Sequence, residues 1–245
     1  RRFAHVAASH MHARGMEVML VDAPRATPVL SFLVREHGCG GGVVISASHN
    51  PPSDNGVKIY GADGAQVLGA RDAALTAAIE RAASAPLPPL DMNAALPTGP
   101  GGVRCLVGAE LSSVVDEPYL RCVLDVGVRA GSLAPSGLSV VYTPLHGVGH
   151  AGVVPALRAR GVEVACVEVQ LDPDEGRFST VQSANPEDPA AFELGLDLAR
   201  SSDADLVIAT DPDADRLGAL VKDAAGEFHF VDGNRLGVLM LDHVL

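Results

Sequence analysis

The chain has 245 residues, of which 47% are hydrophobic, and a formal net charge of −12 at pH 7. This length is sufficient for two α/β domains, each with its own hydrophobic core. The acidic balance leaves no basic stripe for a phosphate backbone or an anionic bilayer, so we expect neither nucleic acid nor membrane as a partner. A small anionic substrate stays compatible with this charge, because a few local cations suffice to bind it.

The cysteines and the apolar segments indicate the compartment. The four cysteines are widely spaced and form no C-x-x-C pair, which is typical of reduced thiols in a cytosolic protein. No apolar run reaches the roughly 18 residues of a membrane span, and no signal peptide is recognisable. We therefore expect a cytoplasmic protein. Arg1 and Leu245 both lie within expected helices, so we also expect a fragment of a longer protein.

Helices and strands are expected to alternate in the first half of the chain. Thr27 and Pro28 are typical of an N-cap and a first helical turn. Residues 84–102 contain five prolines and three glycines, which predicts a linker. The expected helices are 1–14, 27–37 and 71–83, and the expected strands are 16–21, 43–45 and 57–60.

The second half alternates more regularly. Loops over 143–149 and 171–186 separate strands from helices, and 217–221 with 227–231 form an expected hairpin. The expected helices are 113–128, 150–160, 187–200 and 233–245, and the remaining expected strands are 138–142, 162–167 and 205–209.

This alternation predicts crossover units, in which helices cover both faces of a sheet. The predicted fold class is α/β, with two three-layer α/β domains whose sheets are mixed and mostly parallel. The expected domains are 1–102 and 103–232, and 233–245 would begin a connection to a third domain. Ligands of such sheets gather at the carboxyl ends of strands, where two polar loops of this chain lie.

The first polar loop comes after the expected strand 43–45. Ser48, His49 and Asn50 precede two prolines, which stiffen the loop. A serine hydroxyl is a weak nucleophile unless it is held and activated, and a rigid loop can hold it. Lys58, ten residues beyond Ser48, could act on phosphate as a point charge or as an acid/base. An ordinary Ser/Asn/Pro turn with a solvated Lys58 is the alternative.

The second polar loop comes after the expected strand 205–209. Asp211, Asp213 and Asp215 stand at alternate positions, so one tight loop can direct three carboxylates at one cation. Arg216 takes the sixth position, where an EF-hand has glycine. Mg²⁺ usually completes its shell with water or substrate phosphate, so the sequence predicts a magnesium site. A solvated acidic turn is the alternative.

Four segments together resemble one family. They are ISASHNPPSDNGVKIY at 45–60, YTPLHGVG at 142–149, Asn185-Pro186-Glu187, and DPDADRLG at 211–218. In this order they resemble the α-D-phosphohexomutases over nearly the whole chain, closest to the branch of phosphoglucomutases, phosphomannomutases and phosphopentomutases. The resemblance implies the first two domains of a four-domain enzyme, with the phosphoserine loop in domain I and the metal loop in domain II.

The resemblance also implies roles for individual residues. Ser48 would be the phosphorylated serine. Asp211, Asp213 and Asp215 would bind one Mg²⁺ per active site, together with an oxygen on Ser48.

Further polar residues would complete this site. Lys58 and His49 would assist catalysis, Lys58 by proton transfer or charge stabilisation. Arg216 and Asn50 would bind phosphate or substrate, with Arg216 against the phosphoserine region. His146 is expected to be structural.

The implied reaction is phosphoryl transfer between C1 and C6 of a hexose phosphate. Glucose 1-phosphate and glucose 6-phosphate are the expected substrates, a bisphosphate is the intermediate, and glucose 1,6-bisphosphate is the activator. Phosphomannomutase or phosphopentomutase specificity is an alternative. The sugar-binding and distal phosphate-binding loops of the family are absent from this sequence, so we expect the chain alone to be poorly active.

Two other functions remain open. A phosphatase of the haloacid-dehalogenase type would use Asp211 as its nucleophile, although such proteins usually have threonine where Ala214 stands, and Ser48 would have no role. An inactive remnant, or a metal-binding module, is the non-enzymatic alternative.

Overall fold

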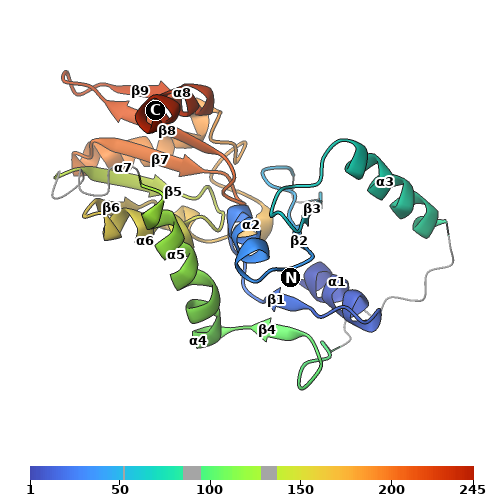
Figure 1. The fold of residues 1–245 in the computed structure, drawn as a ribbon. Coiled ribbons are helices and arrows are strands. Elements are labelled where there is room, and N and C mark those ends of the chain that lie inside the picture. The colour runs from blue at the N-terminus through green and yellow to red at the C-terminus, as the bar shows by residue number, and fades with distance from the viewer. Residues whose placement is uncertain (52, 85–94, 128–136) are drawn as a thin grey trace. The chain divides into compact units, whose positions relative to one another are not determined.

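A computed structural model describes residues 1–51, 53–84, 95–127 and 137–245 (Figure 1). Its contacts group into two units that interleave along the chain. The first unit comprises Arg1–Pro24, Val29–Ser46 and Gly56–Val115, and the second comprises Arg25–Pro28, Ala47–Asn55 and Asp116–Leu245. Most of the expected linker, residues 85–94, lies outside the described residues, and the domain boundary at residue 102 stays a prediction.

The first unit contains every helix and strand expected before the linker. A short strand after the linker, β4, was not predicted, and it pairs with β1, which is distant in the chain. The elements are α1 (Arg2–Ala13), β1 (Met19–Val21), α2 (Thr27–Glu36, whose first two residues belong to the second unit), β2 (Gly41–Ile45), β3 (Val57–Gly61), α3 (Ala70–Ala83), β4 (Arg104–Leu106) and α4 (Gly108–Leu111).

The strands of the first unit form two separate pairs. β1 pairs in parallel with β4, and β2 pairs antiparallel with β3, with Val44 opposite Lys58. Helix α2 packs tightly on β2, since a Cβ at Gly42 would lie 2.7 Å from the Val34 side chain. The β2–β3 pair thus carries the chain into and out of the loop that contains Ser48.

The second unit is built on one five-stranded sheet with the order β6-β5-β7-β8-β9 (Figure 1). Both strands of the expected hairpin are present as β8 and β9. The elements are α5 (Glu117–Asp125), β5 (Ser139–Thr143), α6 (His150–Ala159), β6 (Glu163–Cys166), the 3₁₀ turns Glu168–Gln170, Asp174–Gly176 and Pro189–Phe192, α7 (Glu193–Ser202), β7 (Leu206–Thr210), β8 (Leu217–Lys222), β9 (Phe228–Val231) and α8 (Gly233–Val244).

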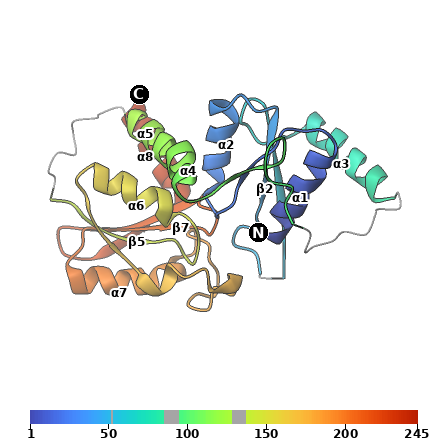
Figure 2. The ribbon, with the colours of Figure 1, turned by 90° about the horizontal axis from the view of Figure 1, so that it is seen from below.

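Alternating side chains of β5 face opposite layers of the second unit. Val141 packs with Val207 and Ala199 in one cluster, on the side of α7. Val140 and Tyr142 pack in another cluster, which includes Val154 of α6. Figure 2 shows α6 and α7 on opposite sides of the sheet, so the three-layer prediction is confirmed for this unit.

The sheets are mixed, as predicted, but they are not mostly parallel, because strands that follow each other through single loops pair antiparallel. Among the described strands, three pairs are parallel and three are antiparallel, the latter being β2–β3, β7–β8 and β8–β9. The parallel part, β6-β5-β7, places the ends of β5 and β7 at the same edge of the sheet. The loops after β5 and β7 are therefore neighbours, and these loops carry the YTPLHGVG and DPDADRLG segments.

The helix expected over 113–128 begins earlier and is interrupted. Helix α4 continues through a π turn, Ser112–Asp116, into α5. Pro118 has no N–H for the carbonyl four residues before it, and the wider π turn accommodates that missing bond. Within the described ranges, none of the helices combines the length and apolarity that crossing a bilayer requires.

Candidate active site

The acidic loop, Asp211–Asp215, leaves the carboxyl end of β7 at the sheet edge. Ala214 adopts a left-handed conformation, with φ +54°, which turns the loop back toward β8. The turn brings Asp211, Asp213 and Asp215 together, with one ligand atom of each within 4.8 Å of the others. Asp211 and Asp213 are buried and Asp215 is exposed, so the cluster opens to solvent on one side.

Asp211 holds the loop together through both of its carboxylate oxygens. Its Oδ1 accepts hydrogen bonds from the backbone N–H groups of Asp215 (3.1 Å) and Arg216 (3.0 Å). Its Oδ2 accepts the Ser48 hydroxyl at 2.6 Å. Burial raises the pKa of Asp211 to about 7, with a further contribution from Asp213, while the Ser48 hydrogen bond acts in the opposite direction. A nearby cation would therefore be strongly stabilising here.

Ser48 lies on the serine loop, Ala47–Asn55, which belongs to the second unit. Its φ of +53° is uncommon for a residue with a side chain. Because the hydroxyl proton is donated to Asp211, Nδ1 of His49, at 3.2 Å, is the donor to Ser48 Oγ. Burial lowers the pKa of His49, and the charge of Arg216 lowers it further. The loop thus presents Oγ between a ring nitrogen and a carboxylate.

The loop after β5 packs directly against the acidic loop. The backbone N–H of Val148 donates to Pro212 O at 2.9 Å. A Cβ at Gly147 would lie 2.3 Å from Pro212 Cα, and one at Gly149 would lie 3.2 Å from the Ala214 Cβ. Only glycine at 147 permits this approach of two backbones, which is why the YTPLHGVG segment supports the site.

A buried polar network shapes this supporting loop. Thr143 donates to Gln170 Oε1 (2.5 Å), and Gln170 Nε2 donates to the Thr180 hydroxyl (2.9 Å). The Thr180 hydroxyl lies 2.7 Å from His146 Nε2, and His146 Nδ1–H donates to Asp172 O (2.6 Å). The carbonyl oxygen of Asp172 can only accept, so Nδ1 is the nitrogen of His146 that donates to it. The position of His146, 3% exposed within this network, favours the structural role expected from the sequence.

Arg216 faces a loop that the sequence also singled out. Its Nη1 lies 4.0 Å from Oε1 of Glu187, and this glutamate comes directly after Pro186. A Cβ at Gly218 would lie 2.2 Å from Pro186 O, so this loop packs on the start of β8. The structure thus brings Asn185-Pro186-Glu187 beside Arg216, where a paired guanidinium can exchange partners with an anion.

Two residues near the start of helix α2 belong to the same unit as the acidic loop, and one of them, Thr27, was missed as a site residue. Thr27 donates its N–H to Asp213 O (2.8 Å) and its hydroxyl to Asp213 Oδ2 (3.0 Å). Arg25 makes a two-point ion pair with Asp116, at 2.7 and 2.8 Å. The Thr-Pro pair predicts only a helix start, and no sequence signal indicates a partner so distant in the chain.

The remaining predicted site residues have different surroundings. Asn50 is exposed, and its N–H closes a turn with Ala47 O at 3.1 Å. Lys58 lies on β3 in the first unit, whereas Ser48 belongs to the second. The roles of Asn50 and Lys58 in the site therefore stay predictions.

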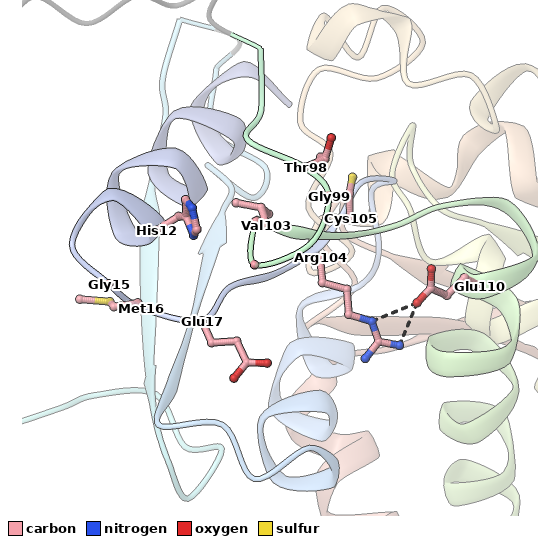
Figure 3. Close-up of a pocket in the computed structure, with 12 residues that line it drawn as sticks. His12, Gly15, Met16, Glu17, Thr98, Gly99, Val103, Arg104, Cys105 and Glu110 are labelled. Atoms are coloured by element: carbon pink, nitrogen blue, oxygen red, sulfur yellow. Dashed lines mark hydrogen bonds and ion pairs between the residues drawn. The ribbon is translucent and has the colours of Figure 1, made fainter.

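A cavity of about 660 Å³ lies in the first unit (Figure 3). It contains none of the predicted site residues. Arg104, one of the lining residues, donates to Glu110 at 2.8 Å, so the guanidinium already has an anionic partner. The residues that line the cavity are His12, Gly15, Met16, Glu17, Thr98, Gly99, Gly101, Gly102, Val103, Arg104, Cys105 and Glu110. The chemistry of this chain therefore points to the acidic loop rather than to the cavity.

The donor set of the acidic loop fits a hard divalent cation. All three side chains of the triad, Asp211, Asp213 and Asp215, offer carboxylate oxygens, which Mg²⁺ and Ca²⁺ prefer. Burial, and then the neighbouring Asp213, raise the pKa of Asp211, and a bound cation would favour its charged form. The triad can therefore hold a metal ion.

A serine hydroxyl held against an oxygen-rich acidic loop, at the carboxyl end of a parallel strand, defines a class of α/β protein suited to phosphoryl transfer. Residues 1–86 and 117–226 match the family descriptions "Phosphoglucomutase/phosphomannomutase, alpha/beta/alpha domain I" and "domain II", respectively. The chain belongs to the phosphoglucomutase/phosphomannomutase family.

Known relatives and structures agree with this family. A phosphoglucomutase of Staphylococcus epidermidis (strain ATCC 12228 / FDA PCI 1200) is 40% identical over 98% of this chain and 42% of the relative. One of Staphylococcus aureus (strain USA300) is 37% identical, with the same coverage. The crystal structure of a putative phosphomannomutase from Thermus thermophilus has a TM-score of 0.68 and 26% identity, over 92% of this chain and 46% of that one. The chain thus spans less than half the length of these relatives.

Proposed function

We propose that this chain carries the phosphoserine and metal loops of a phosphosugar mutase that transfers a phosphoryl group between C1 and C6 of a hexose phosphate. One observation carries the proposal: Ser48 Oγ lies 2.6 Å from Asp211 Oδ2, in a loop with three clustered carboxylates. Such an arrangement holds a hydroxyl nucleophile where phosphoryl charge can be neutralised.

Ser48 alternates between its phosphorylated and free forms in the proposed reaction. A sugar hydroxyl attacks the phosphorus of phosphorylated Ser48, the bond from phosphorus to Oγ breaks, and a sugar bisphosphate results. The sugar hydroxyl loses its proton in this step and Oγ gains one. In the return step Oγ attacks the other phosphate, and the sugar oxygen leaves with a proton. In its free form, Ser48 already directs Oγ at the acidic loop through the hydrogen bond to Asp211.

The surrounding side chains have separate tasks in this proposal. Asp211, Asp213 and Asp215 would hold one divalent cation, Mg²⁺ by donor chemistry, which offsets the charge of the transferring phosphoryl group. Arg216, with Asn50, would bind phosphate. The family resemblance adds proton transfer or charge stabilisation by Lys58.

His49 has a more local task. Its Nδ1 donates to Ser48 Oγ and helps to orient it, and its lowered pKa favours the neutral ring for this purpose.

The substrate is a small sugar phosphate in this proposal. Glucose 1-phosphate and glucose 6-phosphate fit the relatives named phosphoglucomutase, and glucose 1,6-bisphosphate would be the activator. Mannose or pentose phosphates are the alternative substrates. Because the chain covers 42% of those relatives, we propose that it isomerises sugar phosphates poorly by itself.

Phosphosite mapping tests this function. The chain is incubated with Mg²⁺ and glucose 1,6-bisphosphate and analysed by mass spectrometry, with Ser48→Ala as the control. The expected result is one phosphate on Ser48 that the variant lacks. Phosphate released by hydroxylamine would instead indicate an acyl phosphate on Asp211 and the phosphatase alternative. Metal binding without any phosphate, both on this chain and on a full-length protein that contains it, would contradict the mutase mechanism and favour a metal-binding module.

A further inference from the structure

Thr27 makes two hydrogen bonds to one residue of the acidic loop. Its N–H donates to Asp213 O at 2.8 Å, and its hydroxyl donates to Asp213 Oδ2 at 3.0 Å. Both residues are buried, Thr27 being 3% exposed and Asp213 5% exposed. Both also belong to the second unit, although 186 positions separate them in the chain. One donor pair thus fixes the backbone and the carboxylate of Asp213 together.

We propose that Thr27 is a positioning residue that orients the Asp213 carboxylate for metal binding. The proposal rests on the proposed function of the acidic loop as a metal site. A carboxylate can rotate about its side-chain bonds, and the neighbouring charges of Asp211 and Asp215 favour its turning away when no cation is bound. The Thr27 hydroxyl opposes that rotation by holding one oxygen.

The identity of the residue suits this task. Threonine is β-branched, so its χ1 angle is restricted and its hydroxyl is directed rather than free. Pro28, the next residue, fixes φ within the first turn of α2. The hydroxyl proton of Thr27 is committed to Asp213, so the residue acts on the acidic loop as well as beginning a helix. A hydrogen bond that orients a metal ligand typically changes metal affinity by about 10–100-fold.

The segment Arg25–Pro28 does not depend on the Thr27 hydroxyl for its attachment. Arg25 pairs with Asp116 through two hydrogen bonds, and the backbone N–H of Thr27 bonds Asp213 O independently. Removal of the hydroxyl therefore leaves the segment in place and changes only the carboxylate. Replacement of Arg25 weakens the attachment of the segment but keeps the Thr27 hydroxyl beside Asp213, which provides a matched control.

The test measures Mn²⁺ affinity of the chain by electron paramagnetic resonance of the free ion. Thr27→Val keeps the shape of the side chain and removes the donor, so we expect its dissociation constant for Mn²⁺ to rise about 10–100-fold. Thr27→Ser keeps the donor and should bind Mn²⁺ like the original chain. Arg25→Met should lower the melting temperature but change Mn²⁺ affinity by much less than the roughly 10-fold lower limit expected for Thr27→Val.

Three results would overturn the proposal. They are a Thr27→Val chain that binds Mn²⁺ as tightly as the original, an Arg25→Met chain that loses as much affinity as Thr27→Val, and a Thr27→Ser chain that binds no better than the valine variant. If the valine variant does not fold, Thr27→Ala against Thr27→Ser is judged by the same criterion. Absence of Mn²⁺ binding by the original chain would instead contradict the metal site of the proposed function, and with it this inference.

Discussion

The acidic loop and the serine loop meet at the hydrogen bond from Ser48 to Asp211 but are supported very differently. Val148 and Thr27 hold the acidic loop from two other segments, through Pro212 O and Asp213 O. The serine loop is more exposed, and its turns, such as Asn50 N–H to Ala47 O, are local. The difference indicates that the acidic loop is a preorganised frame, against which the more exposed serine loop places its hydroxyl.

Replacement of Asp211 should have the largest effect, because its carboxylate bonds both Ser48 of the serine loop and the backbone of the acidic loop. Asp211→Asn keeps the shape but removes the charge, so metal affinity should fall by more than about 100-fold, beyond the effect of an outer-shell partner. Phosphate on Ser48 should disappear as well. Calorimetric titration with Mn²⁺ and intact mass measure the two effects. Asp242→Asn, at an exposed position of α8, is the control and should change neither.

Gly147→Ala tests the support of the acidic loop directly. The new Cβ would lie 2.3 Å from Pro212 Cα and 2.6 Å from Pro212 O, and both are backbone atoms that cannot turn aside. We expect the free energy of unfolding to fall by about 1–3 kcal/mol, as for an overpacked core, together with weaker metal binding. Urea unfolding of the metal-free chain measures the first effect.

Gly152→Ala is the matched control for this substitution. A Cβ there would meet Tyr119 at an ordinary 3.7 Å, within helix α6. Alanine favours a helix over glycine by about 0.5–1 kcal/mol, so this variant should be as stable as the original chain or more so. Equal losses for both variants would mean that the contact with Pro212 has no special importance.

The smallest expected effect concerns the pH dependence of the loop between Asp174 and Ser179, which precedes Thr180 of the buried polar network. Asp174 accepts the side chain and the N–H of Ser179 and pairs with Arg177, which lowers the pKa of Asp174 to about 2. In the unfolded chain this carboxyl has its ordinary pKa of about 4. Because its pKa is lower in the folded chain, its interactions stabilise the fold above about pH 4, and this stabilisation is lost as the pH falls toward 2.

Amide exchange of Ser179, followed by NMR between pH 5 and about 2, measures this loss. Protection of that amide should decline across the range in the original chain. In Asp174→Asn, which has no carboxyl group at this position, protection of the Ser179 amide should be low and should change little with pH. A decline of equal size in the variant would show that another group is responsible.

The sequence predicts local features of this molecule well and distant contacts poorly. The strands and helices of the second unit result from apolar runs between Gly- and Pro-rich loops, and the spacing of Asp211, Asp213 and Asp215 predicts their cluster. In the sequence Thr27 indicates only a helix start, because its partner Asp213 is distant in the chain. Gly147 indicates only a loop, because its need for glycine arises from another backbone.

The central claim is that Ser48 and the acidic loop form one site. The most direct test is ³¹P NMR of the chain phosphorylated on Ser48, recorded with and without Mn²⁺, which broadens the signals of nearby nuclei. The account predicts that the phosphoserine signal broadens strongly at low Mn²⁺ concentration, and that Asp213→Asn abolishes this effect. A phosphoserine signal that stays sharp while Mn²⁺ is bound to the chain would contradict the account.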